Sequence, residues 1–361
     1  MTQIGFLFTH FYLTPNSCSN ILYFYIMAEK NISISYLRVI ATVFVIAIHA
    51  STGFLYRYDA DSFDWNYANW INAATRCAVP LFVMISGALL LQKDESIISF
   101  YRKRIPKLLY PFIFWTIIYT IYYFYRYTNF SILPSWRIWE IAWHKILYGA
   151  NAHLWYLYMI MGLYTAIPFL RKMVSQCSAR ELEVFLVLWF VSLFFMNKSY
   201  NLPKFDLTFF SGYIGYLVLG YYLTLRKITW NTWFLLFLYA CAVVGIAIGT
   251  YYLSEKLQKW DTQLMGYTMP TAALTAVLLF TCVQSFSRNI TNIPSWIALV
   301  DRYSFGIYLV HILPLNYVHP LISKYVSTVW VIPLATLATL VLSIALIFLL
   351  RRIPYGRHVS G

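Results

Sequence analysis

The chain has 361 residues, of which 60% are hydrophobic and only 11% are charged. A soluble domain carries about 25% charged residues, so the composition excludes a soluble globular protein and predicts an all-α bundle of membrane-spanning helices. The formal net charge of +14 could indicate a nucleic-acid-binding protein. The cations, however, lie in short loops between apolar segments, where they set the orientation of a membrane protein. We therefore expect the lipid bilayer, and no nucleic acid, as a partner.

Residues 1–26 differ from the rest of the chain because their apolar run is broken by proline and small polar residues. No Lys or Arg precedes Lys30, so the segment lacks the cationic region of a secretory signal peptide. Met27 is followed by Ala-Glu-Lys and resembles a natural start. We expect residues 1–26 to be an upstream-start extension or an interfacial segment, and residues 27–361 to form one membrane domain.

Ten apolar segments are long enough to be expected as membrane-spanning helices. They are residues 34–55, 67–91, 105–125, 153–170, 182–197, 208–225, 229–253, 265–286, 304–325 and 328–350. With this assignment the loops on one side carry 16 Lys and Arg residues, and those on the other side carry nine. The positive-inside rule then places both termini in the cytoplasm. The outer segment 126–152 contains three tryptophans and is expected to include a helix in the membrane interface.

The first expected span contains both Arg38 and His49. Eleven residues at about 100° each bring the two side chains to one helix face, about 16 Å apart along the axis. A charged or titratable group inside the bilayer is costly, which makes the pair a functional candidate. The alternatives are an arginine that snorkels to the interface and a histidine that bonds to a neighbouring helix.

Four cations lie at the start of the third expected span, on the same predicted side as Arg38. They are Arg102, Lys103, Arg104 and Lys107. The cluster could be only a topology signal, because cytoplasmic loops are rich in such residues. It could also be an anion clamp, because arginine and lysine are the usual ligands of phosphate groups.

Arg76 lies about nine residues inside the second expected span, too deep to snorkel easily. It needs a partner anion, backbone carbonyls or a water-filled cavity, and a structural ion pair is the competing interpretation. Pro80 follows four residues later, and we expect it to kink the helix.

Five further residues are candidates for a polar cavity or a substrate site. His153 and Trp155 open the fourth expected span at the outer face, where they could also be ordinary interfacial residues. Ser304, Tyr308 and His311 follow the spacing i, i+4, i+7 and share one helix face. Two imidazoles inside the membrane indicate a polar cavity, although His311 alone could be a satisfied core histidine.

The sequence has no recognisable nucleotide-binding loop, metalloprotease motif or nucleophile elbow. No two of its five cysteines are spaced as a pair of metal ligands. We therefore expect no metal site.

Taken together, these motifs resemble the bacterial acyltransferase-3 family of integral-membrane O-acyltransferases. The runs that carry the resemblance are Arg-x10-His (Arg38 and His49), RCAVPLFVMISG (Arg76 to Gly87), KRIPKLLYP (Lys103 to Pro111), HLWYL (His153 to Leu157) and YSFGIYLVH (Tyr303 to His311). The chain is most similar to members that acetylate enterobacterial common antigen and other surface polysaccharides. It departs from the family at Lys107, where arginine is common, and arginine alone binds phosphate in two-pronged fashion.

The resemblance implies a protein of the bacterial inner membrane that takes an acetyl or other small acyl group from cytoplasmic acetyl-CoA. The acceptor would be a hydroxyl of a surface glycan or a lipid-linked sugar at the outer side. The CoA phosphates would meet Arg38, Arg104 and Lys107, with Arg102 beside them. His49 would act as general base or carry the acyl group briefly, because an ordinary imidazole pKa of about 6.5 suits either role.

Two other classes of function remain open from the sequence. A transporter or flippase for a glycolipid or an anion could use the same arginines and histidines as a binding site or proton relay. No internal repeat relates the two halves of the chain, which argues against this class. A structural partner of a polysaccharide synthase would explain the spans, but it would not explain Arg38, His49 and Arg76.

Overall fold

The computed structural model describes residues 15–127, 134–195 and 212–361. Within these ranges the secondary structure is helical and contains no strand, which confirms the expected all-α polytopic bundle. The α-helices are α1 (Pro15–Leu55), α2 (Phe63–Thr75), α3 (Ala78–Leu90), α4 (Ile97–Tyr127), α5 (Ser135–Tyr148), α6 (Trp155–Gln176), α7 (Ala179–Phe195), α8 (Ile214–Leu225), α9 (Thr232–Leu257), α10 (Pro270–Ser287), α11 (Ser295–Val310), α12 (Ile312–Ile322), α13 (Thr328–Leu350) and α14 (Gly356–Val359). Two short 3-10 helices, η1 (Ala152–Leu154) and η2 (Gln263–Met265), precede α6 and α10.

Each of the ten expected spans corresponds to helix in the described ranges, but not all of these helices have full length. Seven helical segments are long and apolar enough to cross a bilayer, and α11 with α12 adds an eighth if this pair, bent by 82°, is one span. The remaining two, α7 and α8, have 17 and 12 residues. They are separated by residues 196–211, which lie outside the described ranges. The protein is thus a multi-pass membrane protein.

The second expected span is built from two helices, because the chain breaks between α2 and α3 at Arg76 and Cys77. The cause is Pro80, which has no N–H to bond to the Arg76 carbonyl and whose ring excludes that carbonyl. The helix is therefore interrupted where the kink is expected, and Arg76 lies at a helix end.

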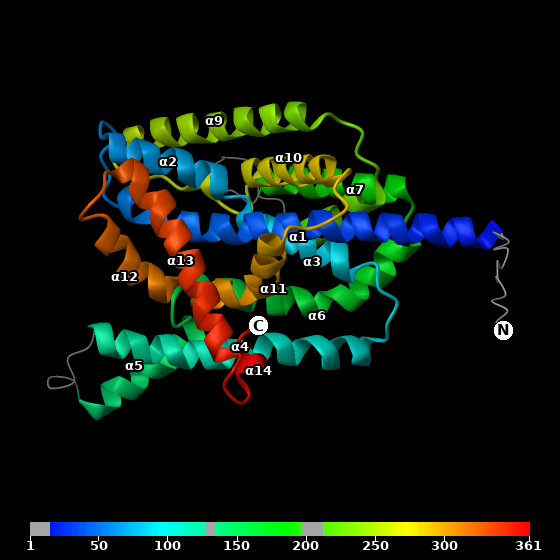
Figure 1. Cartoon of the computed structure of the whole chain (residues 1–361). Coiled ribbons are helices and arrows are strands. Elements are labelled where there is room, and N and C mark those ends of the chain that lie inside the picture. The colour runs from blue at the N-terminus through cyan, green and yellow to red at the C-terminus, as the bar shows by residue number, and fades with distance from the viewer. Residues whose placement is uncertain (1–14, 128–133, 196–211) are drawn as a thin grey trace, which may run out of the picture.

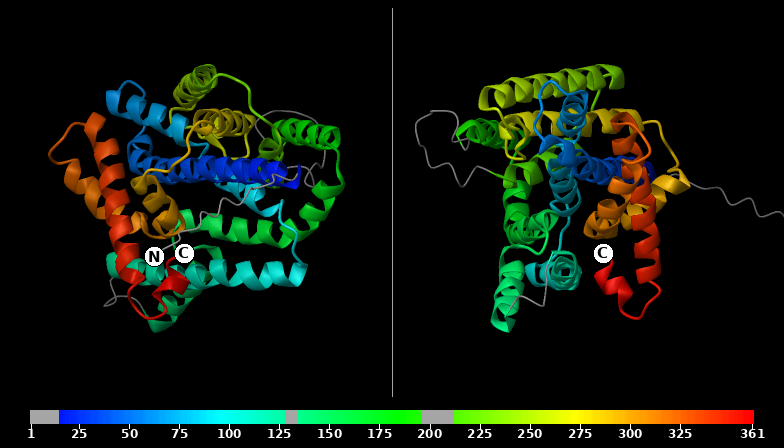
Figure 2. Two further views of the ribbon diagram at one scale, coloured as in Figure 1. Left: turned by 45° about the vertical axis from the view of Figure 1, so that its right-hand side comes forward. Right: turned by 90° about the vertical axis from the view of Figure 1, so that its left-hand side faces the viewer.

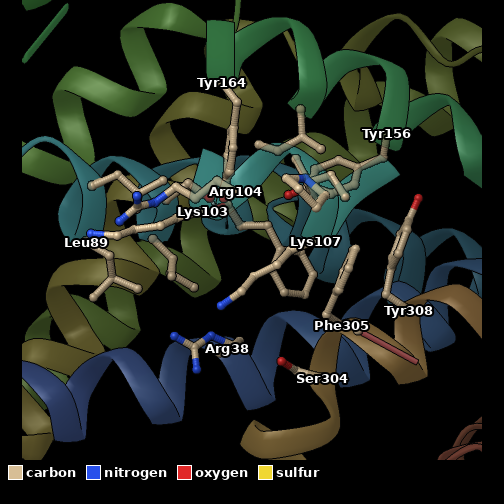
Figure 3. Close-up of a pocket in the computed structure, with 18 of the residues that line it drawn as sticks. Arg38, Leu89, Lys103, Arg104, Lys107, Tyr156, Tyr164, Ser304, Phe305 and Tyr308 are labelled. Carbon is tan, nitrogen blue, oxygen red and sulfur yellow. Dashed lines mark hydrogen bonds between the residues drawn. The ribbon is translucent and has the colours of Figure 1, made fainter. Parts of the chain in front are cut away.

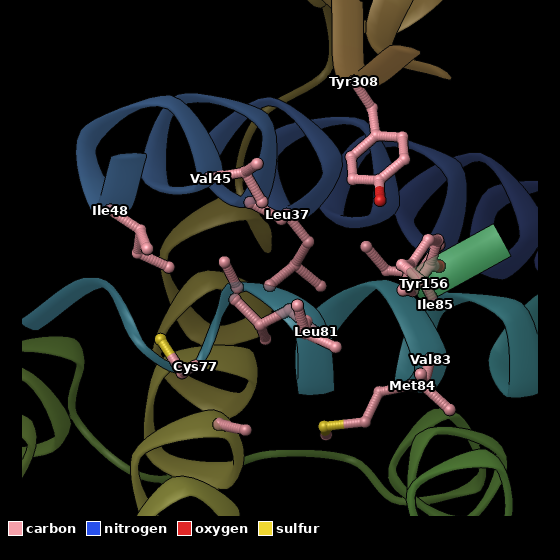
Figure 4. Packing of buried hydrophobic residues seen from close by; sticks show 14 of the residues in the cluster. Leu37, Val45, Ile48, Cys77, Leu81, Val83, Met84, Ile85, Tyr156 and Tyr308 are labelled. Carbon is pink, nitrogen blue, oxygen red and sulfur yellow. The ribbon is translucent and has the colours of Figure 1, made fainter. Parts of the chain in front are cut away.

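The helix α1 runs through the middle of the bundle and contacts α2, α3, α10, α11 and α13 (Figures 1 and 2). Its first residues, from Pro15, project beyond the other helices (Figure 1); residues 1–14 of the expected extension lie outside the described ranges. In Figure 4, Leu37 and Val45 of α1 lie close to Leu81 of α3. Leu37 and Leu81 are fully buried, so α1 and α3 form the centre of the core.

Two glycines let α3 and α8 approach each other closely. A Cβ atom on Gly87 would lie 1.9 Å from the carbonyl oxygen of Leu217, and one on Gly220 would lie 2.0 Å from that of Met84. Small residues allow this contact in a bilayer, where helices associate through close packing and not through exclusion of water.

The segment 126–152, which contains three tryptophans, includes α5, as expected. None of the residues of this helix is buried, and Trp136, Trp139 and Trp143 are exposed. An exposed tryptophan face is typical of a helix in the membrane interface.

Candidate functional site

A cavity of about 1020 Å³ lies between α1, α3, α4, α6 and α11 (Figure 3). This volume is at the upper end of the usual range for ligand sites, about 300–1,000 Å³. Seven cationic side chains line it, against one acidic side chain, that of Asp301. The cations are Arg38, Lys93, Lys103, Arg104, Lys107, Arg302 and Arg357. Such an excess of positive charge attracts an anionic ligand.

The charged and the aromatic side chains occupy different parts of the cavity. In Figure 3, Arg38, Lys103, Arg104 and Lys107 gather toward one end, and Tyr156, Phe305 and Tyr308 lie toward the other. The expected meeting of Arg38 with the cations near the start of α4 is therefore present. Arg102 is exposed and does not line the cavity.

Arg38 is held by a residue that the sequence analysis did not select. Its guanidinium forms an ion pair with Asp301 of α11, whose second oxygen accepts a hydrogen bond of 2.8 Å from Ser35. The pair joins α1 to α11 across 263 positions of sequence. The ion pair holds the Arg38 side chain at the cavity wall. A snorkelling arginine would instead extend toward the membrane interface.

Arg104 is held by a second acidic residue that the sequence analysis did not select. Glu95 lies 2.7 Å from Arg104, and 3.5 Å from both Lys103 and Arg171. Burial alone raises the pKa of Glu95, but the hydrogen bond and charge of Arg104, with the charges of Arg171 and Lys103, outweigh it and lower this pKa below its usual value. Glu95 is therefore ionised at neutral pH and anchors the first turns of α4.

Lys107 differs from these two arginines because it has no carboxylate partner among the described residues. Its side chain is exposed and lines the cavity. An unpaired cation of this kind is free to bind an anion.

Tyr308 connects the cavity to a cluster of three histidines. Its ring lies 5.7 Å from that of His153 and 5.9 Å from that of His311, centroid to centroid. His49 lies 5.2 Å from His311 and 6.4 Å from His153 by the same measure. Ser304, one turn before Tyr308, is buried and lines the cavity. The residues expected from the first, fourth and ninth spans thus come together.

Hydrogen bonds fix two rings of the cluster, whereas His49 has no hydrogen bond to the described residues. His153 has contacts of 3.0 Å to Asn151 and 3.3 Å to the carbonyl of Leu309. His311 Nδ1 lies 2.7 Å from the carbonyl of Tyr308, and its Nε2 has no partner among the described atoms. His49 is half-buried. Within the described ranges no group of His, Cys, Asp and Glu residues could hold a metal ion.

Arg76 lies in an aromatic environment at the break between α2 and α3. Its Nη1 donates to the Tyr267 hydroxyl at 3.2 Å, and its guanidinium lies 5.9 Å from the Trp260 ring. Trp155 stacks on Tyr267 with ring centroids 5.5 Å apart. The alternative of a structural ion pair finds no carboxylate partner for Arg76 in the described part of the chain.

Comparison with known proteins agrees with the resemblance seen in the sequence. A family model described as an acyltransferase domain, that of the acyltransferase-3 family, matches residues 31–348. No curated protein and no solved structure shows a significant match to the chain. The matched range contains the cations near the start of α4, all three histidines of the cluster, Arg76 and Asp301.

Proposed function

The chain belongs to the acyltransferase-3 family and is a membrane acyltransferase, and we propose that it carries an acetyl group from acetyl-CoA to a hydroxyl of a surface glycan or lipid-linked sugar. The donor binds from the cytoplasm of a bacterial cell, and the acceptor binds at the outer side of the inner membrane. Both termini face the cytoplasm in this proposal.

The observation that carries the proposal is one cavity with cations toward one end and Tyr308 toward the other (Figure 3), where the Tyr308 ring contacts the rings of His153 and His311. The phosphates of CoA suit the cationic end, where Lys107 is unpaired and the guanidinium groups of Arg38 and Arg104 are held in place. The apolar and aromatic walls, including Phe82, Ile160 and Tyr156, suit the extended arm that carries the thioester. This arrangement directs the thioester toward Tyr308 and the histidines.

In the proposed reaction His49 acts as the general base. It accepts the proton of the acceptor hydroxyl while the hydroxyl oxygen attacks the thioester carbonyl. A C–O bond forms, the C–S bond breaks, and the proton passes from His49 to the departing sulfur. In the covalent variant of this route, an imidazole nitrogen of His49 carries the acetyl group between the two partners. Either route needs a histidine that both substrates can reach, and His49 is the half-buried member of the cluster.

Arg76 and its aromatic neighbours suit the acceptor. Sugars and aromatic rings both present flat apolar faces, and Trp155 is 37% exposed while stacked on Tyr267. Arg76 adds a positive charge without a described carboxylate partner, which suits an anionic or phosphate-linked glycan. We propose that these residues hold the acceptor while His153 and His311 line the path to His49.

The test compares the masses of surface glycans from cells with and without the gene. Loss of an acetyl-sized mass supports the proposal, and purified protein should then release free CoA from acetyl-CoA only when the glycan acceptor is added. Accumulation of an unmodified glycolipid on the cytoplasmic side, with no change in acetylation, would instead indicate a flippase.

A further inference from the structure

After α13 the chain reverses direction, and residues 351–361 pack against α4 and α11 (Figure 1). Tyr355 adopts a left-handed backbone with φ of 60° at the turn. A Cβ atom on the next residue, Gly356, would lie 1.7 Å from the carbonyl oxygen of Leu350. Only glycine permits this close return, so the turn is encoded in the sequence.

Three contacts fix the segment after the turn. The indole N–H of Trp115 donates to the Val359 carbonyl at 2.9 Å, and Arg351 Nε donates to the Ser360 hydroxyl at 3.0 Å. Ser360 is fully buried. Its carbonyl oxygen would lie 2.4 Å from a Cβ atom on Gly306, so α11 and the segment are in direct backbone contact. The segment is therefore a built part of the bundle.

This segment forms one wall of the cationic cavity. Arg357, His358 and Gly361 line it together with Arg38 and Lys107. The family match ends at residue 348, so the wall lies beyond the part of the chain that the family model describes.

Arg357 has no counter-ion of its own. Arg38 is paired with Asp301, and Arg104 with Glu95, whereas Arg357 forms no ion pair in the described part of the chain. Its side chain is exposed at the cavity wall. A planar guanidinium can bind two oxygens of one phosphate group, which the ammonium of Lys107 cannot do.

We infer that Arg357 is a donor-binding residue, whose guanidinium binds a phosphate group of CoA alongside Lys107. This inference rests on the proposed function, because it assigns a further contact to the same donor. It also gives the reversed segment a role: the anchors at Trp115 and Arg351 hold Arg357 at the cavity.

The experiment measures CoA affinity of the full-length protein in detergent by calorimetry, for wild type, Arg357→Ala and Arg352→Ala. Arg352 is the matched control, because it is an exposed arginine of the same segment that does not line the cavity and lies against the Phe348 ring. Both variants remove one positive charge. We expect Arg357→Ala to weaken CoA binding about tenfold, the lower end for a charged hydrogen bond to an exposed group. Arg352→Ala should leave it unchanged, and Arg357→Lys should recover part of the loss.

The outcomes separate this inference from the proposed function. If wild type binds CoA and Arg357→Ala binds it as tightly as Arg352→Ala does, the inference is wrong and the donor assignment stands. If wild type does not bind CoA, the proposed function fails and the inference fails with it. Removal of the Arg357 side chain breaks no hydrogen bond or ion pair that the described residues show, so a folding defect is not expected, and unchanged thermal unfolding verifies this.

Discussion

His49 on α1 contacts His153 and His311. A substitution that keeps the size of its side chain can separate a catalytic role from a packing role. His49→Gln keeps a hydrogen-bonding side chain of similar size but cannot carry a proton at neutral pH. We expect this variant to insert normally, bind CoA as wild type does, and lose about 10²–10⁴-fold in turnover, the usual value of a general base. Loss of a covalent carrier would cost more, because one difficult step then replaces two easier ones.

The control for the His49 variant is the same substitution at the neighbouring His311. His311→Gln removes an imidazole whose Nδ1 already lies against a backbone carbonyl. Glycan acetylation near the wild-type level in His49→Gln, together with its loss in His311→Gln, would transfer the catalytic role to His311. Membrane levels of both variants are measured first, and a stabilised background is used if either fails to accumulate.

Glu95 provides a test of the charge network at the start of α4. Its pKa is lowered in the folded protein, so its contribution to stability is present above the ordinary value of 4.5 and is lost as the pH falls through the native value. Glu95→Gln should lower the free energy of unfolding by about 1–3 kcal/mol at pH 7. The difference from wild type should shrink on acidification.

The measurement is thermal unfolding in detergent at several pH values. Glu140→Gln is the matched control, because Glu140 forms an exposed ion pair with Arg137 on α5, and exposed pairs contribute little. A Glu95→Gln effect as small as that of Glu140→Gln at pH 7 would mean that the network does not stabilise α4.

At the scale of the elements, the contact between α3 and α8 depends on backbone proximity at Gly87 and Gly220. An added methyl group at either position would collide with a carbonyl group of the other helix, at about 2 Å. Gly87→Ala and Gly220→Ala should therefore each destabilise the protein by about 1–3 kcal/mol, the usual cost of overpacking. Gly245→Ala on α9 is the control, since a Cβ there meets nothing within 4 Å. Equal unfolding temperatures for all three variants would contradict the close contact.

Proline explains two breaks in the helices, of which only one was expected from the sequence. Pro80 lies four residues after Arg76, where α2 ends, and Pro314 lies four residues after Val310, where α11 ends before the 82° bend. Each proline lacks the N–H that would bond to the carbonyl four residues earlier, that of Arg76 or Val310. Proline alone does not decide the matter, because α4 continues through Pro106 and Pro111. Packing determines which prolines interrupt a helix.

At the scale of the whole molecule, hydropathy predicts the helices. The distribution of Lys and Arg predicts that the cations near the start of α4 lie on the same side as Arg38. Their partners could not be predicted, because Asp301 and Glu95 bind arginines on other elements and no local spacing links them. Asp301 did carry one signal: it is an acidic residue beside an apolar span, which is uncommon. The reversal after α13 could not be read from periodicity, because it depends on one glycine and on distant anchors.

The orientation of the protein in the membrane can be tested with reporters fused into its loops. Apart from Arg38 on α1, every cation that lines the cavity comes from the segments that the sequence assigns to the side with the excess of Lys and Arg. If the donor is cytoplasmic CoA, these segments must be cytoplasmic too, so the charge asymmetry and the proposed donor site require the same orientation. A topology reporter fused within residues 226–228 should therefore report the cytoplasm, and one fused within 256–259 should report the outside. A reporter at 226–228 that faces outward would invalidate both the orientation and the route of the donor.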